Sequence, residues 1–167
     1  MTVRRRALAA LGAAACGGAL AGCGFRLRGA AVMPFSTLYL GFPSSTTLSA
    51  DLRRALRNTG TRLVDLPQEA EVRLDVLSET RERDISAYST SGRPREYQLR
   101  LRVRFRARDA SDRELIAVSE ILLRRQISVN DSLGTLSADE VALLYRDMEN
   151  DMIQQLIRRL AAVRGTA

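Results

Sequence analysis

The stretch Leu99-Arg100-Leu101-Arg102-Val103-Arg104-Phe105-Arg106-Ala107-Arg108 alternates apolar and cationic residues at every position. Because successive side chains of a β-strand point to opposite faces of its sheet, this pattern predicts a long strand with one buried face and one face of guanidinium groups. Like charges on alternate residues lie roughly 7 Å apart and repel each other modestly. The cationic face is therefore either a solvated face balanced by acids on neighbouring strands or a surface that binds an anion or a partner.

The residues around this strand predict further strands. Residues 109–112 have the composition of a turn, and residues 114–125 are expected to return as an antiparallel strand. The polar stretch 79–95 is expected to be a loop or a loose hairpin tip. Alternation also predicts a half-buried strand around Val72, Leu74 and Val76. In the returning strand, the residues expected to face inward are Leu115, Ala117, Ile121 and Leu123, with Glu114 and Glu120 offsetting some of the arginine charge.

Two amphipathic helices are expected on either side of the strands. The first follows candidate caps at residues 44–47 and ends near Gly60; its apolar positions are Leu48, Leu52, Ala55 and Leu56. The second begins at Ser137, where Glu140 completes a Ser-x-x-Glu capping box, and runs for about seven turns. Its apolar face consists of Val141, Leu144, Tyr145, Met148, Met152, Leu156, Leu160 and Val163.

With a first strand at residues 36–42, the element order is strand, helix, strand, strand, strand, helix. Helices and sheets bury their apolar faces by packing in layers, so we expect an α/β chain of the α+β two-layer sandwich type. It would have a four-stranded mixed sheet with both amphipathic helices on one face, and the arginines on the other. The sequence does not decide whether residues 61–65 add a brief extended segment. The domain is expected to span residues 36–165.

The N-terminal segment has the features of a bacterial lipoprotein signal: three arginines, an apolar run from Ala7, then Leu20-Ala21-Gly22-Cys23. The apolar run is shorter than the roughly 20 residues that span a bilayer, and small residues before a cysteine favour lipidation over plain secretion. We expect residues 1–22 to be removed, diacylglycerol to be attached to Cys23, and residues 23–35 to form a lipidated tether. Gly24, in place of Asp, favours the periplasmic side of the outer membrane. The general and twin-arginine export routes both stay open.

The composition argues against catalysis. The chain has no His, and its two cysteines, Cys16 and Cys23, lie in or next to the signal. The exported domain would therefore lack a disulfide, a thiol nucleophile and the commonest metal ligands, and no Ser-His-Asp triad can be built. Asp147, Glu149 and Asp151 on the second helix are expected to be solvated rather than to form an acid–base pair. We expect a protein that is not an enzyme and that uses no cofactor and no metal.

The charge points to an anionic partner. All 26 cationic residues are Arg, and the formal net charge is +7. Arginine binds phosphate and carboxylate groups through a planar fork. In an exported protein, such a surface is expected to meet anionic lipid or glycolipid and no nucleic acid. The loop at residues 88–95 is either an exposed tip or a contact loop. The candidate binding residues are Arg93, Arg95, Arg100, Arg102, Arg104 and Arg106.

Three segments resemble the family of the LPS-assembly lipoprotein LptE: Cys23-Gly24-Phe25-Arg26-Leu27-Arg28-Gly29, Glu96-Tyr97-Gln98-Leu99 and Gln155-Leu156-Ile157-Arg158-Arg159-Leu160. The resemblance implies a two-layer α/β domain that forms a stoichiometric complex with the outer-membrane barrel LptD and sits inside it as a plug. It also implies binding of lipopolysaccharide, help in placing it in the outer leaflet, and a role in barrel assembly. The family's basic positions fall near Thr90 and Ser137 here, so neighbouring Arg93 and Arg95 and the arginine strand become the candidate lipopolysaccharide contacts.

A second interpretation of the residues stays open. An outer-membrane lipoprotein of this size could instead recruit or activate a periplasmic cell-wall enzyme. A periplasmic hydrolase is disfavoured because the exported part lacks His, and its one cysteine, Cys23, is expected to carry the lipid.

Overall fold

The computed structural model describes residues 32–43, 45–129 and 137–163. Its elements, in chain order, are β1 (Thr37–Gly41), α2 (Thr47–Arg57), β2 (Arg62–Val64), the 3₁₀ helix η1 (Pro67–Glu69), β3 (Val72–Tyr88), β4 (Pro94–Asp109), β5 (Glu114–Ser128) and α3 (Ala138–Ala161). The expected signal peptide, Cys23 and most of the expected tether lie outside the described residues. Neither α2 nor α3 is both long and apolar enough to cross a membrane.

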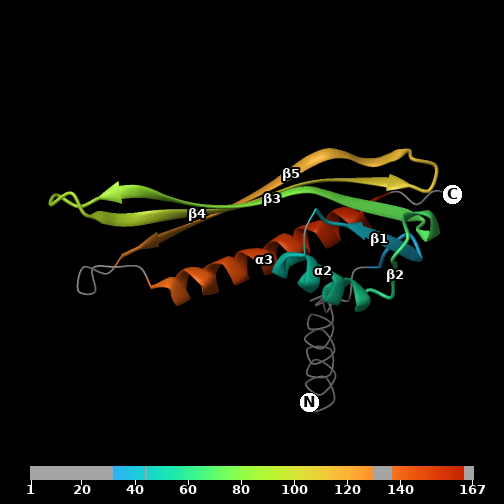
Figure 1. Cartoon of the computed structure of the whole chain (residues 1–167), viewed down its shortest axis with the longest axis horizontal. Coiled ribbons are helices and arrows are strands. Elements are labelled where there is room, and N and C mark those ends of the chain that lie inside the picture. Colours follow the sequence, from blue (N-terminus) through green and yellow to red (C-terminus); the bar gives the residue numbers. More distant parts are fainter. Residues whose placement is uncertain (1–31, 44, 130–136, 164–167) are drawn as a thin grey trace, which may run out of the picture. The chain divides into compact units, whose positions relative to one another are not determined.

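The strands form one mixed sheet in the order β2-β1-β3-β4-β5 (Figure 1). β1 runs parallel to β2 and β3, whereas β3, β4 and β5 are antiparallel. The expected α+β sandwich and order of elements are confirmed, but four strands were too few, because β2 is a fifth. β2 has only three residues, which is too short to show an alternation, and it pairs only with β1 along one edge.

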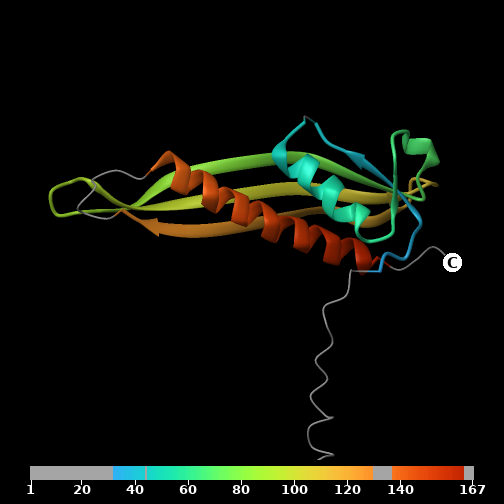
Figure 2. The same cartoon turned by 90° about the horizontal axis from the view of Figure 1, so that it is seen from below.

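Both helices lie on the same side of the sheet, and α3 runs obliquely across the long strands (Figures 1 and 2). The alternation predicted for β4 is confirmed, since its apolar face is buried beneath the helices. Burying one such side chain is worth roughly 1.5–3 kcal/mol. The largest fully buried side chains are Phe105, Leu38, Leu48, Leu52, Leu56, Leu74, Leu99, Leu101, Met148, Met152, Leu156 and Leu160. Met33 and Phe35, in the segment expected to be a tether, are also buried in this core.

Both helices begin at a hydroxyl N-cap. In α2, the cap is Thr46, which forms a reciprocal capping box with Ser49. In α3, the cap is Ser137 as expected, but its hydroxyl accepts from the backbone N–H of Asp139 at 3.3 Å, one residue before the expected Glu140. Either donor satisfies an N–H that the first helical turn leaves unpaired.

The hairpin between β3 and β4 is much longer than its sequence indicates. β3 continues to Tyr88 and β4 begins at Pro94, so the prediction of a loop over residues 79–95 is wrong for all but residues 89–93. The charged residues of β3 favour solvent when taken alone. Here they lie directly opposite residues of β4, and cross-strand pairing of opposite charges stabilises an extended ladder.

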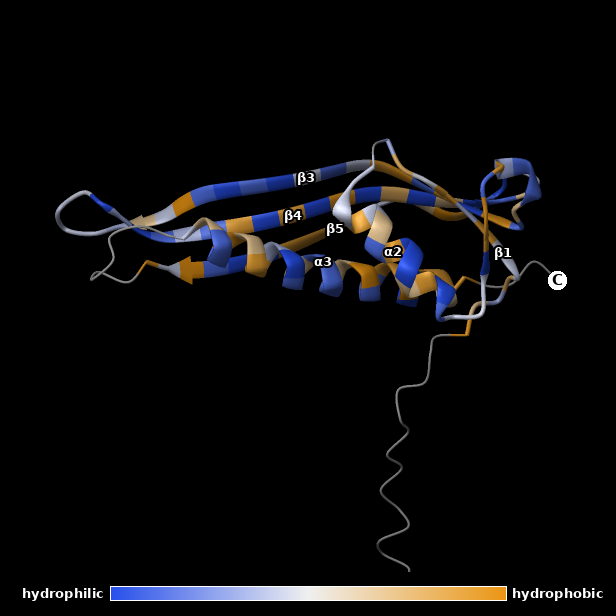
Figure 3. Ribbon diagram, turned by 60° about the horizontal axis from the view of Figure 1, so that its bottom comes forward, coloured by the Kyte–Doolittle hydropathy of each residue, from blue (hydrophilic) through white to orange (hydrophobic). Residues whose placement is uncertain are grey.

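One extra residue in β3 exchanges the two faces of that strand. Val76 lies opposite Phe105 and Ser78 lies opposite Arg104, so Leu77 has no partner in the register. Beyond this bulge, Arg81 points to the helix-covered face, and Glu82 points to the arginine-bearing face. Figure 3 shows that β3 is mostly hydrophilic between the bulge and the hairpin turn.

The pairing of β4 with β5 is also shifted in register. Ser119 is opposite Phe105 and Ile116 is opposite Ala107, so Ala117 and Val118 together face one residue of β4. The expectation that Ala117 faces inward is therefore wrong, because Ala117 is exposed. The other inward residues are as predicted: Ile121 is buried, and Leu115 and Leu123 are half-buried against the core.

Candidate functional site: the arginine face and the hairpin turn

The helix-free side of β4 carries a row of arginines, which we call the arginine face: Arg100, Arg102, Arg104, Arg106 and Arg108. The alternation of β4 places them there, and β3 supplies most of the neighbouring acids. Near the hairpin turn, Arg100 contacts Glu82 at 3.2 Å and Asp84 at 2.6 Å. These acids reach it because the bulge at Leu77 directs them to this face.

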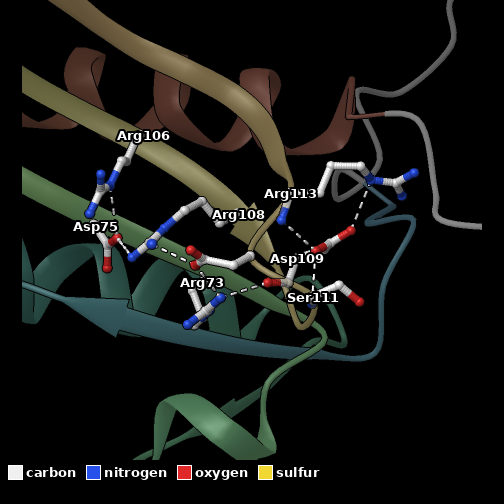
Figure 4. Close-up of polar contacts among 8 residues, drawn as sticks. Arg73, Asp75, Arg106, Arg108, Asp109, Ser111 and Arg113 are labelled. Carbon is white, nitrogen blue, oxygen red and sulfur yellow. Dashed lines mark hydrogen bonds and ion pairs between the residues drawn. The ribbon is translucent and has the colours of Figure 1, made fainter.

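The other end of the arginine face is also balanced by acids (Figure 4). One carboxylate oxygen of Asp75 lies 3.1 Å from Nε of Arg106 and 2.8 Å from Nη2 of Arg108. Asp112 binds Arg108 at 2.5 Å and Arg73 at 2.8 Å. The hydrogen bond with Asp75 raises the pKa of Arg108, although burial opposes it. This end of the face therefore has little charge left for a ligand.

The turn between β4 and β5 is held by Asp109 (Figure 4). Its carboxylate accepts the backbone N–H groups of Ser111 and Arg113, each at 2.9 Å, and lies 3.0 Å from Nε of Arg113. Burial alone would raise the pKa of Asp109, but these bonds together hold it below its usual value. Asp112 completes the turn at a φ of 67°, a conformation that favours Gly, Asn and Asp.

The middle of the arginine face is the part that its own chain balances least. Arg102 has only a distant partner, Glu120 at 3.8 Å. Arg104 is exposed and forms no ion pair within the described residues. Arg124 of β5 lies opposite Arg100 and adds a further positive charge on the same face. An anionic ligand or wall would therefore be attracted most strongly to this middle region.

Arg93 and Arg95 lie at the far end of the hairpin. Arg93 is exposed in the turn, where its backbone N–H donates to the hydroxyl of Ser89 at 3.2 Å. Arg95 is exposed and is the extra residue of a register shift, so the alternation of β4 does not determine its direction. Arg104 follows Arg95 by nine positions of extended strand, which corresponds to about 30 Å. The structure therefore divides the candidate arginines into two places.

A charged cluster that the sequence analysis does not predict lies buried between β3 and α3. Glu149, expected to be solvated, is 2 % exposed. One of its oxygens lies 2.5 Å from Nη2 of Arg81, and the other has no hydrogen-bond partner. Burial raises the pKa of Glu149, opposed by Arg81 and reinforced by Glu79. Glu149 follows Tyr145 by four residues, so the helical period already places it on the inner side of α3.

A small cavity of about 290 Å³ lies beside this cluster, lined by Phe42, Pro43, Thr46, Glu79 and Arg81. The hydroxyl of Thr46 donates to Glu79 at 2.7 Å, and Arg81 lies over the ring of Tyr145, 5.8 Å from its centre. The polar groups here bind one another across α2, β3 and α3. Within the described residues, no group of three or more acidic, His or Cys side chains could hold a metal ion.

Comparison with known proteins gives consistent results. The chain matches the family LptE, described as Lipopolysaccharide-assembly, over residues 35–160. It is 28% identical over 151 residues to the LPS-assembly lipoprotein LptE of Pectobacterium atrosepticum, covering 87% of this chain and 80% of that protein.

Two solved structures share the fold. The solution structure of an uncharacterized lipoprotein B from Nitrosomonas europaea is 35% identical, with a TM-score of 0.71 over 83% of this chain and 91% of that one. A minor lipoprotein from Acinetobacter baumannii is 24% identical, with a TM-score of 0.59 over 77% and 92% of the two chains. The match over residues 35–160 spans every strand, all of α2 and all but the last residue of α3. The chain therefore belongs to the lipopolysaccharide-assembly lipoprotein family LptE.

Proposed function

We propose that this lipopolysaccharide-assembly lipoprotein is anchored to the periplasmic side of the outer membrane through Cys23 and forms a complex with the barrel LptD. Within that complex it acts as the plug, binds lipopolysaccharide and assists its assembly into the outer leaflet. It does so without catalysis and without a cofactor.

The observation that carries this proposal is the arginine face, a long sheet surface that neither helix covers. A protein that sits inside a barrel meets a polar lumen, so its interface is charged rather than apolar. Lipopolysaccharide is anionic, and arginine binds phosphate through paired N–H groups. Arg102 and Arg104, which their own chain balances least, are the residues that we assign to this contact.

The hairpin turn provides a second contact in this proposal. Arg93 and Arg95 are exposed at the end of the β3–β4 hairpin, far from both helices along the strands (Figure 1). A basic loop tip on a rigid hairpin can reach a ligand or a wall that the sheet face does not touch. The two groups of arginines should therefore contribute separately to binding.

Co-purification from detergent-solubilised outer membranes tests the complex. A tagged copy of the full chain should capture the barrel protein LptD in stoichiometric amount. Capture of a cell-wall enzyme in place of the barrel would favour the second interpretation, and failure to capture the barrel would refute the plug.

Charge reversal tests the arginine face directly. Arg102→Glu combined with Arg104→Glu should weaken lipopolysaccharide binding or the yield of the barrel complex. The matched control is Arg57→Glu with Arg158→Glu, which changes the net charge equally at two exposed arginines of the helices, outside the face. If the control reduces binding as much as the test pair does, the effect comes from total charge, and the assignment to Arg102 and Arg104 fails.

A further inference from the structure

The outer edge of β5 is unpaired among the described residues. β5 is the last strand of the sheet and runs for 15 residues, Glu114–Ser128, without a proline. An edge strand presents a row of backbone N–H and C=O groups that another strand can pair with. Long edges are usually blunted by charges or covered, so the residues along this one decide what it can accept.

The centre of β5 reads Glu120-Ile121-Leu122-Leu123-Arg124 and is complementary to itself. When two copies of this segment run antiparallel with Leu122 opposite Leu122, Glu120 of each copy lies opposite Arg124 of the other. Ile121 then lies opposite Leu123. Opposite charges and apolar side chains that face each other across two strands are mutually stabilising.

The chain itself leaves these side chains available. Arg124 is exposed, lies opposite Arg100 of β4, and forms no ion pair within the described residues. Glu120 is 39% exposed and has only the distant contact with Arg102. Leu122 is half-buried on the same face. An incoming carboxylate beside Arg124 would relieve the repulsion between Arg124 and Arg100.

We propose that a second copy of this chain pairs with the β5 edge, antiparallel and centred on Leu122, so that the two sheets become continuous. The charge complementarity of Glu120 and Arg124 favours a second copy over a strand of unrelated sequence. The register shift at Ala117 and Val118 limits the regular ladder to the part of β5 that follows it. A chain enclosed in the proposed barrel complex has no room for a second copy at this edge, so the pairing belongs to chains outside that complex.

Disulfide crosslinking of the full lipidated chain in detergent tests this register. Directly opposite residues have Cβ atoms about 4.5–5.5 Å apart, so Leu122→Cys should give a crosslinked dimer on mild oxidation. Val118→Cys is the matched control on the same edge. Val118 is 49% exposed, but in this register its two copies are about 27 Å apart. Crosslinking through Val118→Cys equal to that through Leu122→Cys, or no crosslinking through either, would overturn the proposal.

Charge exchange provides an independent readout in the Leu122→Cys background. Arg124→Glu should lower the yield of crosslinked dimer about tenfold, because both charge pairs become repulsive. This is expected even though the change removes a like charge from beside Arg100. Adding Glu120→Arg should restore the dimer. If Arg124→Glu leaves the dimer unchanged or increases it, the charges only protect the edge and the proposal fails. Capture of a different protein at this edge, without self-crosslinking, would refute it equally.

Discussion

The guanidinium of Arg81 lies 2.5 Å from the buried carboxylate of Glu149 and joins the middle of β3 to the middle of α3. The layers are packed by apolar side chains nearer the C-terminal end of α3, at Leu156 and Leu160. Towards its N-terminal end, contacts to β3 are polar: the hydroxyl of Tyr145 donates to the backbone carbonyl of Glu82 at 2.7 Å. The two ends of α3 are therefore held by different forces, and they should respond differently to pH and to mutation.

Glu149→Gln should change how stability depends on pH. Burial raises the pKa of Glu149 above its usual value of 4.5, so the folded state binds this proton more tightly than the unfolded state. The stabilisation that comes from this tighter proton binding by Glu149 is present in full below pH 4.5 and is lost as the pH rises through the raised pKa. Wild type should lose stability relative to the Gln variant over that window. Urea unfolding at a series of pH values measures the stability of both proteins. A difference in stability that stays constant with pH would contradict the prediction.

Removing Arg81 should cost more than removing both partners. Arg81→Met leaves Glu149 buried without its cation, and we expect a loss of about 2–3 kcal/mol, below the range for fully buried pairs because Arg81 is 38% exposed. Adding Glu149→Leu should recover part of that loss. A double-mutant cycle from urea unfolding provides the coupling energy, and purely additive effects would show that the contact has no energetic role.

The positive φ of Asp112 can be separated from its ion pairs. Asp112→Gly and Asp112→Ala both remove a carboxylate that binds Arg73 and Arg108, but only Ala retains the steric cost of a φ of 67°. We expect the Gly variant to be more stable than the Ala variant by about 1 kcal/mol. Thermal unfolding of the two variants tests this, and equal midpoints would mean that the turn relaxes without strain.

Deleting Leu77 should prevent the native fold. Without the extra residue, either Val76 and its neighbours or Arg81 and its neighbours must turn to the wrong face, because a one-residue slip inverts every side chain. Deleting Ser91 is the control, since it shortens β3–β4 only in the turn at residues 89–93. Circular dichroism and proteolysis should show a folded control and an unfolded test variant. A folded chain lacking Leu77 would show that the bulge can move.

The parts that sequence predicts well are those whose pattern is longest. β4 alternates over its whole arginine-bearing length, and α3 repeats its apolar residues over many turns, so both elements and their buried faces are recovered. The position of Arg102 and Arg104 on an uncovered face follows from the same alternation. Their shortage of acidic partners does not, because it depends on which residues of β3 lie across from them.

The remaining differences have local physical causes. β2 consists of only three residues and is held by pairing with β1, which no local propensity reveals. The bulge at Leu77 inserts one residue without a glycine or proline to mark it, so nothing in the sequence shows that Glu82 and Asp84 lie beside Arg100. Glu149 is buried because α3 passes over charged residues of β3, and a carboxylate is normally expected at the surface.

The bulge at Leu77 also limits how this hairpin can change in length during evolution. Every position from Ser78 to Ile85 is assigned to a face by counting from the bulge, and further register shifts follow between Ile85 and Tyr88. An insertion between Leu77 and Glu82 would separate Glu82 from Arg100, whereas an insertion within residues 89–93 would not. Lengthening the paired strands while keeping both faces would require two added residues in each strand. Relatives with longer or shorter hairpins should therefore differ by steps of four residues in the regular ladder, or only in the turn and the irregular residues next to it.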